Sequence, residues 1–159
     1  MHELLLDLSS YIEFQQPTIG VIISALLSAV LLFLSGFASG SEIAFFSLSP
    51  NDLDQLDPNK RVADKNIQLL REDSERTLAT ILITNNLVNV TIIMLSNYVL
   101  TNLVRFKAEW LEFLCITVLL TFLLLLFGEI MPKVYSRQNP LKFCRGATKS
   151  IIFLRRLFW

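Results

Sequence analysis

Several residue types are scarce in this sequence, and each scarcity excludes a class of protein. The 159 residues include a single histidine, His2, and two cysteines, Cys115 and Cys144. Because no pair of nucleophile and base can be placed, we do not expect an enzyme. The 14 acidic and 14 basic residues cancel, which argues against a nucleic-acid partner attracted by net positive charge.

Each end of the sequence also lacks charges of one sign. Residues 1–17 contain three acids but no Lys or Arg, whereas seven Lys or Arg and no acid follow Glu129. Such segregation is typical of the two sides of a membrane. The first residues lack the basic start and cleavage site of a signal peptide, so we expect 1–17 to remain as an extracytoplasmic segment. The apolar spacing at positions 4, 5, 8, 11 and 12 favours a short interfacial helix within residues 1–16.

Hydrophobic residues are abundant, at 53% of the chain, and three runs contain no charge: residues 18–41, 77–104 and 113–128. A helix over the third run reaches only about 24 Å, short of a hydrocarbon core of roughly 30 Å, so that helix must continue into the flanking residues. We therefore predict an all-α membrane protein with spanning helices at about 18–41, 77–104 and 111–132. They form one transmembrane domain over residues 18–159.

The remaining segments predict helices at the membrane surface. Residues 52–76 mix acids and bases, and we interpret their charges as a solvated face. Residues 140–159 combine five bases with apolar residues and favour an amphipathic belt helix on the inner leaflet. The positive-inside rule places the N-terminus outside and the C-terminus in the cytoplasm, since most Lys and Arg follow the first and third runs.

Small and polar residues interrupt the end of the first run. They are Ser35, Gly36, Ser39, Gly40 and Ser41, followed by Glu42. Ser35 and Ser39 share a helix face because they are four residues apart. Small-residue helix packing explains a single serine or glycine here, whereas a whole cluster beside an acid favours a binding site.

The second run is unusually polar, with Asn85, Asn86 and Asn89 in its first half. An unpaired amide in lipid costs several kcal/mol, so these side chains need a partner or water. Asn85 and Asn89 share a face. Interhelical hydrogen bonds and ligation of an ion explain them equally well.

The third run ends in GEIMPK, residues 128–133, where an acid lies at the edge of the apolar slab. An ionisable residue at that depth is a candidate functional residue. Pro132 lacks an N–H and crowds the carbonyl of Gly128, so this turn can leave a carbonyl free. A carboxylate with spare carbonyls suits a hard cation. The predicted topology brings all three polar clusters to one depth, and Lys133 is an alternative structural partner for Glu129.

The motifs LSGFASGSEIA (residues 34–44), NNLVN (85–89) and GEIMPK resemble, in order and spacing, the signatures of the CorC/CNNM transmembrane domain. The resemblance implies a homodimer in the bacterial inner membrane that transports Mg²⁺, with Na⁺-coupled export. It also implies Mg²⁺ bound by Ser39 with Ser35, Asn85, Asn89 and Glu129, beside Gly128.

Members of that family usually continue into CBS modules that bind ATP, and these are absent from this sequence. We therefore expect it to be a piece of a longer protein. A membrane scaffold or assembly subunit, whose polar cluster only joins helices, is the alternative function. Glu129 separates the two, because a dication site needs negative charge that amides do not supply.

Overall fold

The computed structural model describes residues 12–106 and 108–159. Three helical stretches are long and apolar enough to cross a membrane: Ile19–Phe46 (α2), Ser74–Leu103 (α5) and Glu109–Gln138. The last consists of α6 (Glu109–Leu123), a π-helical segment η1 (Leu124–Ile130) and α7 (Met131–Gln138). The predicted all-α membrane fold is confirmed.

Helix α2 extends beyond the charge-free run that predicts it. Its start is capped by Thr18, whose side-chain oxygen accepts a hydrogen bond from the N–H of Val21 at 3.4 Å. At the other end the helix continues past Glu42 to Phe46. The charge does not end the helix, because Lys133 Nζ lies 3.6 Å from Glu42 Oε2 and offsets its cost.

The prediction of a short helix within residues 1–16 is wrong for residues 12–16, and residues 1–11 lie outside the described chain. Ile12–Phe14 (β1) forms an antiparallel ladder with Val104–Phe106 (β2). The ladder pairs backbone groups that would otherwise need water at the ends of α2 and α5. The N–H of Gln15 extends it by donating to the carbonyl of Leu103 at 2.9 Å. The chain entering α2 is thus tied to the chain leaving α5.

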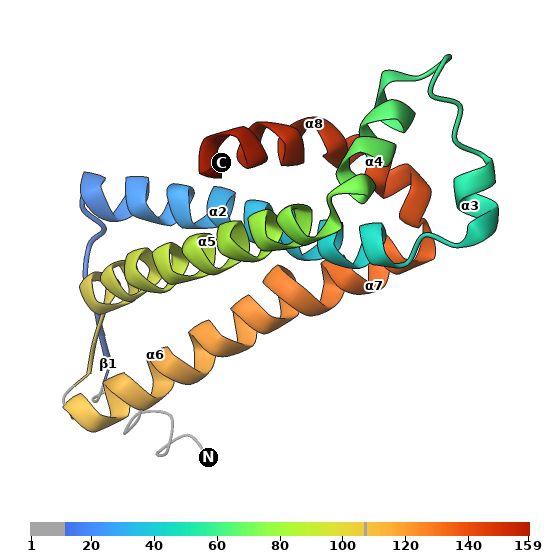
Figure 1. Cartoon of the computed structure of the whole chain (residues 1–159). Helices are drawn as coiled ribbons and strands as arrows, with labels where there is room; N and C mark the ends of the chain where they lie inside the picture. Colours follow the sequence, from blue (N-terminus) through green and yellow to red (C-terminus); the bar gives the residue numbers. More distant parts are fainter. Residues whose placement is uncertain (1–11, 107) are drawn as a thin grey trace.

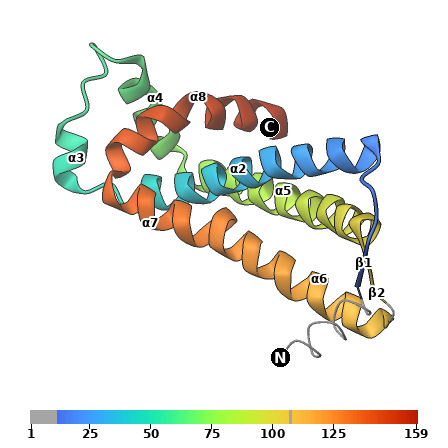
Figure 2. The same cartoon turned by 180° about the vertical axis from the view of Figure 1, so that it is seen from behind.

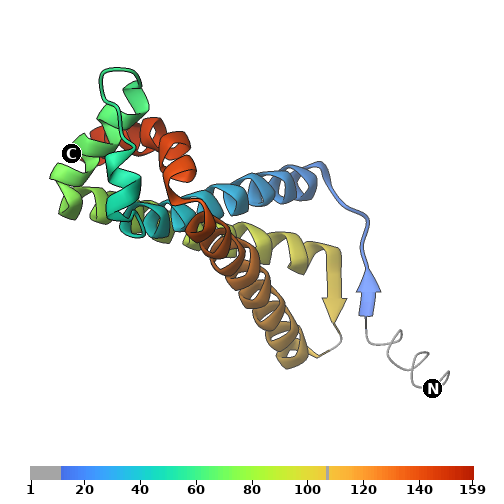
Figure 3. The same cartoon turned by 90° about the vertical axis from the view of Figure 1, so that its right-hand side faces the viewer.

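The three long stretches pack unequally. Helices α2 and α5 lie side by side and antiparallel, with the most extensive contact in the protein (Figure 1). The third stretch approaches α2 only around η1 and α7, while α6 diverges from the pair (Figure 3). The polar clusters of the sequence lie where the three helices converge.

The third stretch is helical through Pro132 and beyond the predicted end at residue 132. The helix continues to Gln138, and the seven residues before Met131 adopt the wider π form, with the Met131 N–H donating to the carbonyl of Leu126, five residues back. A π turn is one way for a helix to continue past a proline, which has no backbone N–H to donate. Such turns are frequent at functional sites.

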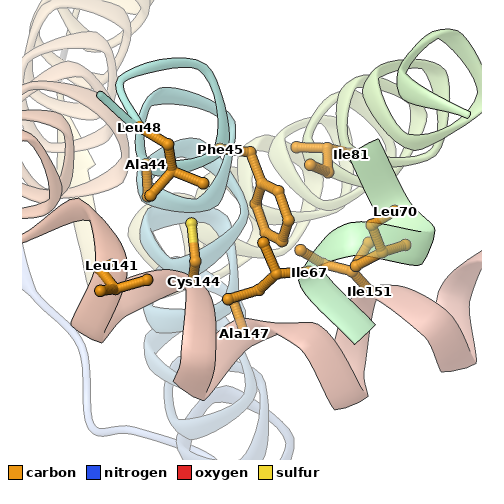
Figure 4. Close-up of a cluster of buried hydrophobic side chains, with 10 residues drawn as sticks. All are labelled: Ala44, Phe45, Leu48, Ile67, Leu70, Ile81, Leu141, Cys144, Ala147 and Ile151. Carbon is orange, nitrogen blue, oxygen red and sulfur yellow. The ribbon is translucent and has the colours of Figure 1, made fainter. Parts of the chain in front are cut away.

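Three further helices pack at the Pro132 end of the bundle: α3 (Pro50–Asp54), α4 (Val62–Glu72) and α8 (Pro140–Phe158). Helix α8 crosses α4 and lies on the side of α2 and α5 opposite to α6 (Figures 1 and 2). One face of α8 is buried against α2, α4 and α5. That face joins a hydrophobic core shown in Figure 4, made of Ala44, Phe45, Leu48, Ile67, Leu70, Ile81, Leu141, Cys144, Ala147 and Ile151. Burial raises the pKa of the Cys144 thiol to about 12, so this cysteine is a packing residue.

The interpretation of residues 52–76 as a solvated charged segment is wrong for Asp64. Its side chain is fully buried and accepts hydrogen bonds from Arg145 Nε at 2.6 Å and Nη2 at 3.0 Å. The backbone N–H of Asp57 also donates to Asp64 Oδ2 at 3.0 Å. A second ion pair joins Asp73 to Arg155 at 2.9 Å. Two of the five bases on α8, Arg145 and Arg155, therefore form ion pairs that hold this helix against α4 and the start of α5.

Candidate metal site

Ser35 is the point at which three helical segments meet. Its fully buried hydroxyl lies 3.1 Å from Asn85 Oδ1 and 2.5 Å from Asn89 Oδ1. A Cβ placed on Gly128 would lie 3.2 Å from the same hydroxyl. Side chains of α2 and α5 and the backbone of η1 therefore surround one oxygen atom.

The cluster has more oxygen acceptors than protons to share among them. One serine hydroxyl carries one hydrogen, so it can donate to Asn85 or to Asn89, but not to both at once. Two amide oxygens nevertheless point at it. A cation bound among the three oxygens would satisfy the surplus lone pairs. Rotating one amide, so that its NH₂ group donates to Ser35, would satisfy them without an ion.

Ser39 lies one turn further along the same face of α2. Its side chain is fully buried, and its Oγ has no hydrogen-bond partner within residues 12–106 and 108–159. A buried hydroxyl without a partner costs about 1–3 kcal/mol, so this atom needs a ligand or water. The buried Oγ of Ser28, seven residues before Ser35, also has no hydrogen-bond partner among the described residues. The sequence does not predict this, because a lone serine in an apolar run does not differ from one that only packs.

Glycines allow the helices to approach each other beside Ser35. A Cβ on Gly36 would lie 2.8 Å from Pro132 Cγ and 3.0 Å from the carbonyl oxygen of Phe127. A Cβ on Gly40 would lie 2.7 Å from the Phe143 ring. The predicted supporting residues Gly36, Gly40 and Pro132 thus form the contact between α2 and the third stretch.

Glu129 follows Gly128 in the π segment and is partly buried. It makes no salt bridge or hydrogen bond with any residue that the structure describes. Lys133 pairs instead with Glu42, so the structure does not support Lys133 as the partner of Glu129. The backbone of Glu129 follows Gly128, which packs against Ser35, but no hydrogen bond joins Glu129 to Ser39 or the asparagines among the described residues.

Two predicted supporting residues face elsewhere. The Ser41 hydroxyl donates to the Phe37 carbonyl at 2.7 Å, which satisfies it within its own helix. Asn86 is exposed on the outer side of α5, away from the buried face that carries Asn85.

The oxygen donors that meet at Ser35 are a hydroxyl and two amide oxygens. Among the described residues, no group of three or more His, Cys, Asp or Glu side chains gathers to hold a metal ion. A site at the junction would therefore be an oxygen-only site, which suits Mg²⁺ better than Zn²⁺ or Cu²⁺.

Replacing Gly36 with alanine is expected to destabilise the protein by about 1–3 kcal/mol, because a backbone carbonyl obstructs the added methyl group. Gly146→Ala is the matched control, since a Cβ there has no neighbour within 4 Å and raises helix propensity by up to about 1 kcal/mol. Thermal unfolding in detergent measures both. Equal midpoints for the two variants would show that the α2–η1 contact is looser than described.

Three long apolar helices around a buried polar junction define an integral membrane protein of the helical class. The cyclin M transmembrane N-terminal domain model matches residues 26–159, and the chain belongs to this family, CNNM. It is 29% identical over 130 residues to the UPF0053 protein of Haemophilus influenzae, covering 82% of this chain and 30% of that protein. It is 30% identical over 135 residues to metal transporter cnnm-4 of Caenorhabditis elegans, covering 80% of this chain and 27% of the relative. The chain thus spans less than a third of either relative.

Proposed function

We propose that this chain is the transmembrane part of a Mg²⁺ transporter. The observation that supports the proposal most is the buried junction at Ser35, where oxygen acceptors outnumber protons and an orphaned Ser39 hydroxyl lies one turn away. Membership of the CNNM family and the name of the worm relative, a metal transporter, agree with it.

The proposed ligands are Ser39 with Ser35, Asn85, Asn89, Glu129 and the backbone carbonyl of Gly128. Mg²⁺ prefers six oxygen ligands in octahedral geometry. In this set only Glu129 is charged, so the protein neutralises half of the ion's charge and dipoles supply the rest. A single carboxylate favours binding that is weak enough to allow release, which transport requires.

The distribution of Lys and Arg supports an orientation in a bacterial inner membrane with the N-terminus outside and the C-terminus in the cytoplasm. We further propose a homodimer, because α6 and α2 expose many large apolar side chains, and Na⁺ as the coupling ion. Regulation by ATP would require CBS modules outside this chain.

Flux through vesicles tests the proposal. The purified chain is reconstituted in liposomes loaded with a Mg²⁺-sensitive dye. A Na⁺ gradient should drive Mg²⁺ across the membrane in the direction opposite to Na⁺ flow, and an equal K⁺ gradient should have little effect. Equal flux with Na⁺ and K⁺ would reject Na⁺ coupling. Absence of flux from vesicles whose protein still binds Mg²⁺ would reject transport by this chain.

A structural role for the cluster is the second candidate function. The observation that favours it is that one rotated amide satisfies Ser35, Asn85 and Asn89 without an ion. In that scaffold, Mg²⁺ would not change the unfolding temperature, and replacing Ser35 with alanine would destabilise the protein equally in Mg²⁺ and in a chelator.

A further inference from the structure

A groove runs along the surface between α2 and α7, up to the first turns of α8. Its lower part, about 470 Å³, has Gly36 and Pro132 as its floor and is walled by Phe33, Phe127 and Met131. Its upper part, about 240 Å³, reaches Asn139, Lys142 and Gly146. Phe37, Tyr135 and Phe143 line both parts. We call this surface the α2–α7 groove.

The groove changes from apolar to polar along its length. Its lower walls lie within the membrane-spanning stretches, whereas Asn139 and Lys142 lie where the third stretch ends and α8 begins. Phe127 and Asn139 are twelve positions apart, which corresponds to about 18 Å of helix. That is close to one leaflet, half of a hydrocarbon core of roughly 30 Å.

The polar end of the groove offers a positive charge. Three of the bases that follow Glu129 pair with acids: Lys133 with Glu42, Arg145 with Asp64 and Arg155 with Asp73. Lys142 is exposed and has no acidic partner among the described residues. Its ammonium group is therefore available to an anion at the membrane surface.

The apolar part has fixed aromatic walls. The rings of Phe37 and Phe143 stack at 5.9 Å between centroids, and Tyr135 meets Phe143 edge-on at 6.4 Å. Phe143 is in turn held by close packing against Gly40. The α2–α7 groove, with packed aromatic walls, suits a narrow, flexible hydrocarbon chain.

We propose that the α2–α7 groove binds one anionic phospholipid from the leaflet at the α8 end, with its phosphate at Lys142 and one acyl chain along Phe127 and Phe33. The floor of the groove is the contact of Gly36 with Pro132 and with the Phe127 carbonyl. A bound lipid therefore stabilises the same contact that holds Gly128 against Ser35. This inference does not depend on the identity of the transported ion.

Native mass spectrometry of the detergent-solubilised chain, titrated with phosphatidylglycerol or phosphatidylcholine of identical acyl chains, tests the proposal. The wild type should hold one phosphatidylglycerol per chain in preference to phosphatidylcholine. Lys142→Gln should reduce that preference about fivefold, the effect of about 1 kcal/mol per basic residue near an anionic surface. Lys149→Gln removes the same charge from an exposed position of α8 outside the groove and should leave the preference unchanged.

Gly146→Phe tests the contribution of the groove to lipid binding while the charge of Lys142 is kept. A Cβ at Gly146 enters open space beside Lys142, so the added ring should fill the upper groove without unfolding the protein, and binding of both lipids should fall. Equal losses in the Lys142 and Lys149 variants, or unchanged binding in Gly146→Phe, would overturn the proposal. Dissociation of a dimer in Gly146→Phe with unchanged lipid binding would also overturn the proposal, because a second copy of the chain would then be the occupant of the groove.

Discussion

Replacing Glu129 with glutamine is expected to abolish the stabilisation of this protein by Mg²⁺. The glutamine keeps the volume and hydrogen-bonding capacity of the side chain but removes the one charge in the proposed ligand set. A ligand that binds only the folded state at 100 times its Kd stabilises that state by about 2.7 kcal/mol. The wild type should show this as a rise in unfolding temperature across a Mg²⁺ titration, and Glu129→Gln should show none while folding normally without Mg²⁺.

Glu42→Gln provides the matched control, since it removes a carboxylate that pairs with Lys133 and not with the proposed ion. Its Mg²⁺-dependent shift should match the wild type. Asn89→Ala should behave like Glu129→Gln, and Asn86→Ala, on the exposed side of α5, like the wild type. A Glu129→Gln protein that is unstable to the same extent with and without Mg²⁺ would show that the carboxylate is structural.

Replacing Arg145 with methionine is expected to lower the free energy of unfolding by about 3–5 kcal/mol, because it leaves the carboxylate of Asp64 buried without a countercharge. The double variant Asp64→Leu with Arg145→Met should recover much of that loss, since no charge then remains buried. Lys149→Met, an exposed position on the same helix, should have little effect. Thermal or denaturant unfolding in detergent measures all three.

The wild type and the Arg145→Met variant should also differ in how strongly acid destabilises them. In the wild type, the Arg145 guanidinium hydrogen-bonded to Asp64 holds the pKa of that carboxyl below its ordinary value, against the opposing effect of burial. This stabilisation is complete above the unfolded-state pKa of about 4 and is lost as the pH falls through the lower folded-state pKa. In Arg145→Met the Asp57 N–H and Arg61 still lower the pKa of Asp64 while burial raises it, so the folded-state pKa should lie closer to the unfolded-state value. The stability of the variant should therefore fall less than that of the wild type as the pH drops below about 4. An equal fall in both proteins would show that the Arg145–Asp64 pair does not cause the pH dependence.

The sequence predicts the spanning helices and the residues of the junction because both depend on local patterns. Long charge-free runs in a 159-residue chain fix the helices, and serines or asparagines four residues apart share a face whatever the tertiary structure. The lengths of the three helices alone bring Ser35, Asn85 and Gly128 to the same depth in the membrane. The ligation by Glu129 stays a prediction, because its side chain makes no hydrogen bond with the other candidates in the described part of the chain.

Features that depend on pairing across the chain could not be predicted in this way. Asp64 and Arg145 are 81 residues apart, and nothing near Asp64 distinguishes it from the solvated acids around it. The π turn before Pro132 lies against Gly36 of α2, a neighbour that is distant in the sequence, whereas proline alone predicts a kink. The strand at Ile12–Phe14 was missed because three residues cannot establish a period, and its partner is 90 residues away.

Anomalous diffraction from crystals of this chain grown with Mn²⁺, an octahedral oxygen-binding substitute for Mg²⁺, tests the central claim most directly. We expect one anomalous peak per chain among Ser39, Asn85, Asn89 and Glu129, at about 2.1 Å from its oxygen ligands, and no peak at that position in Glu129→Gln crystals. A peak elsewhere, or none in crystals of a protein that Mn²⁺ still stabilises, would contradict the account.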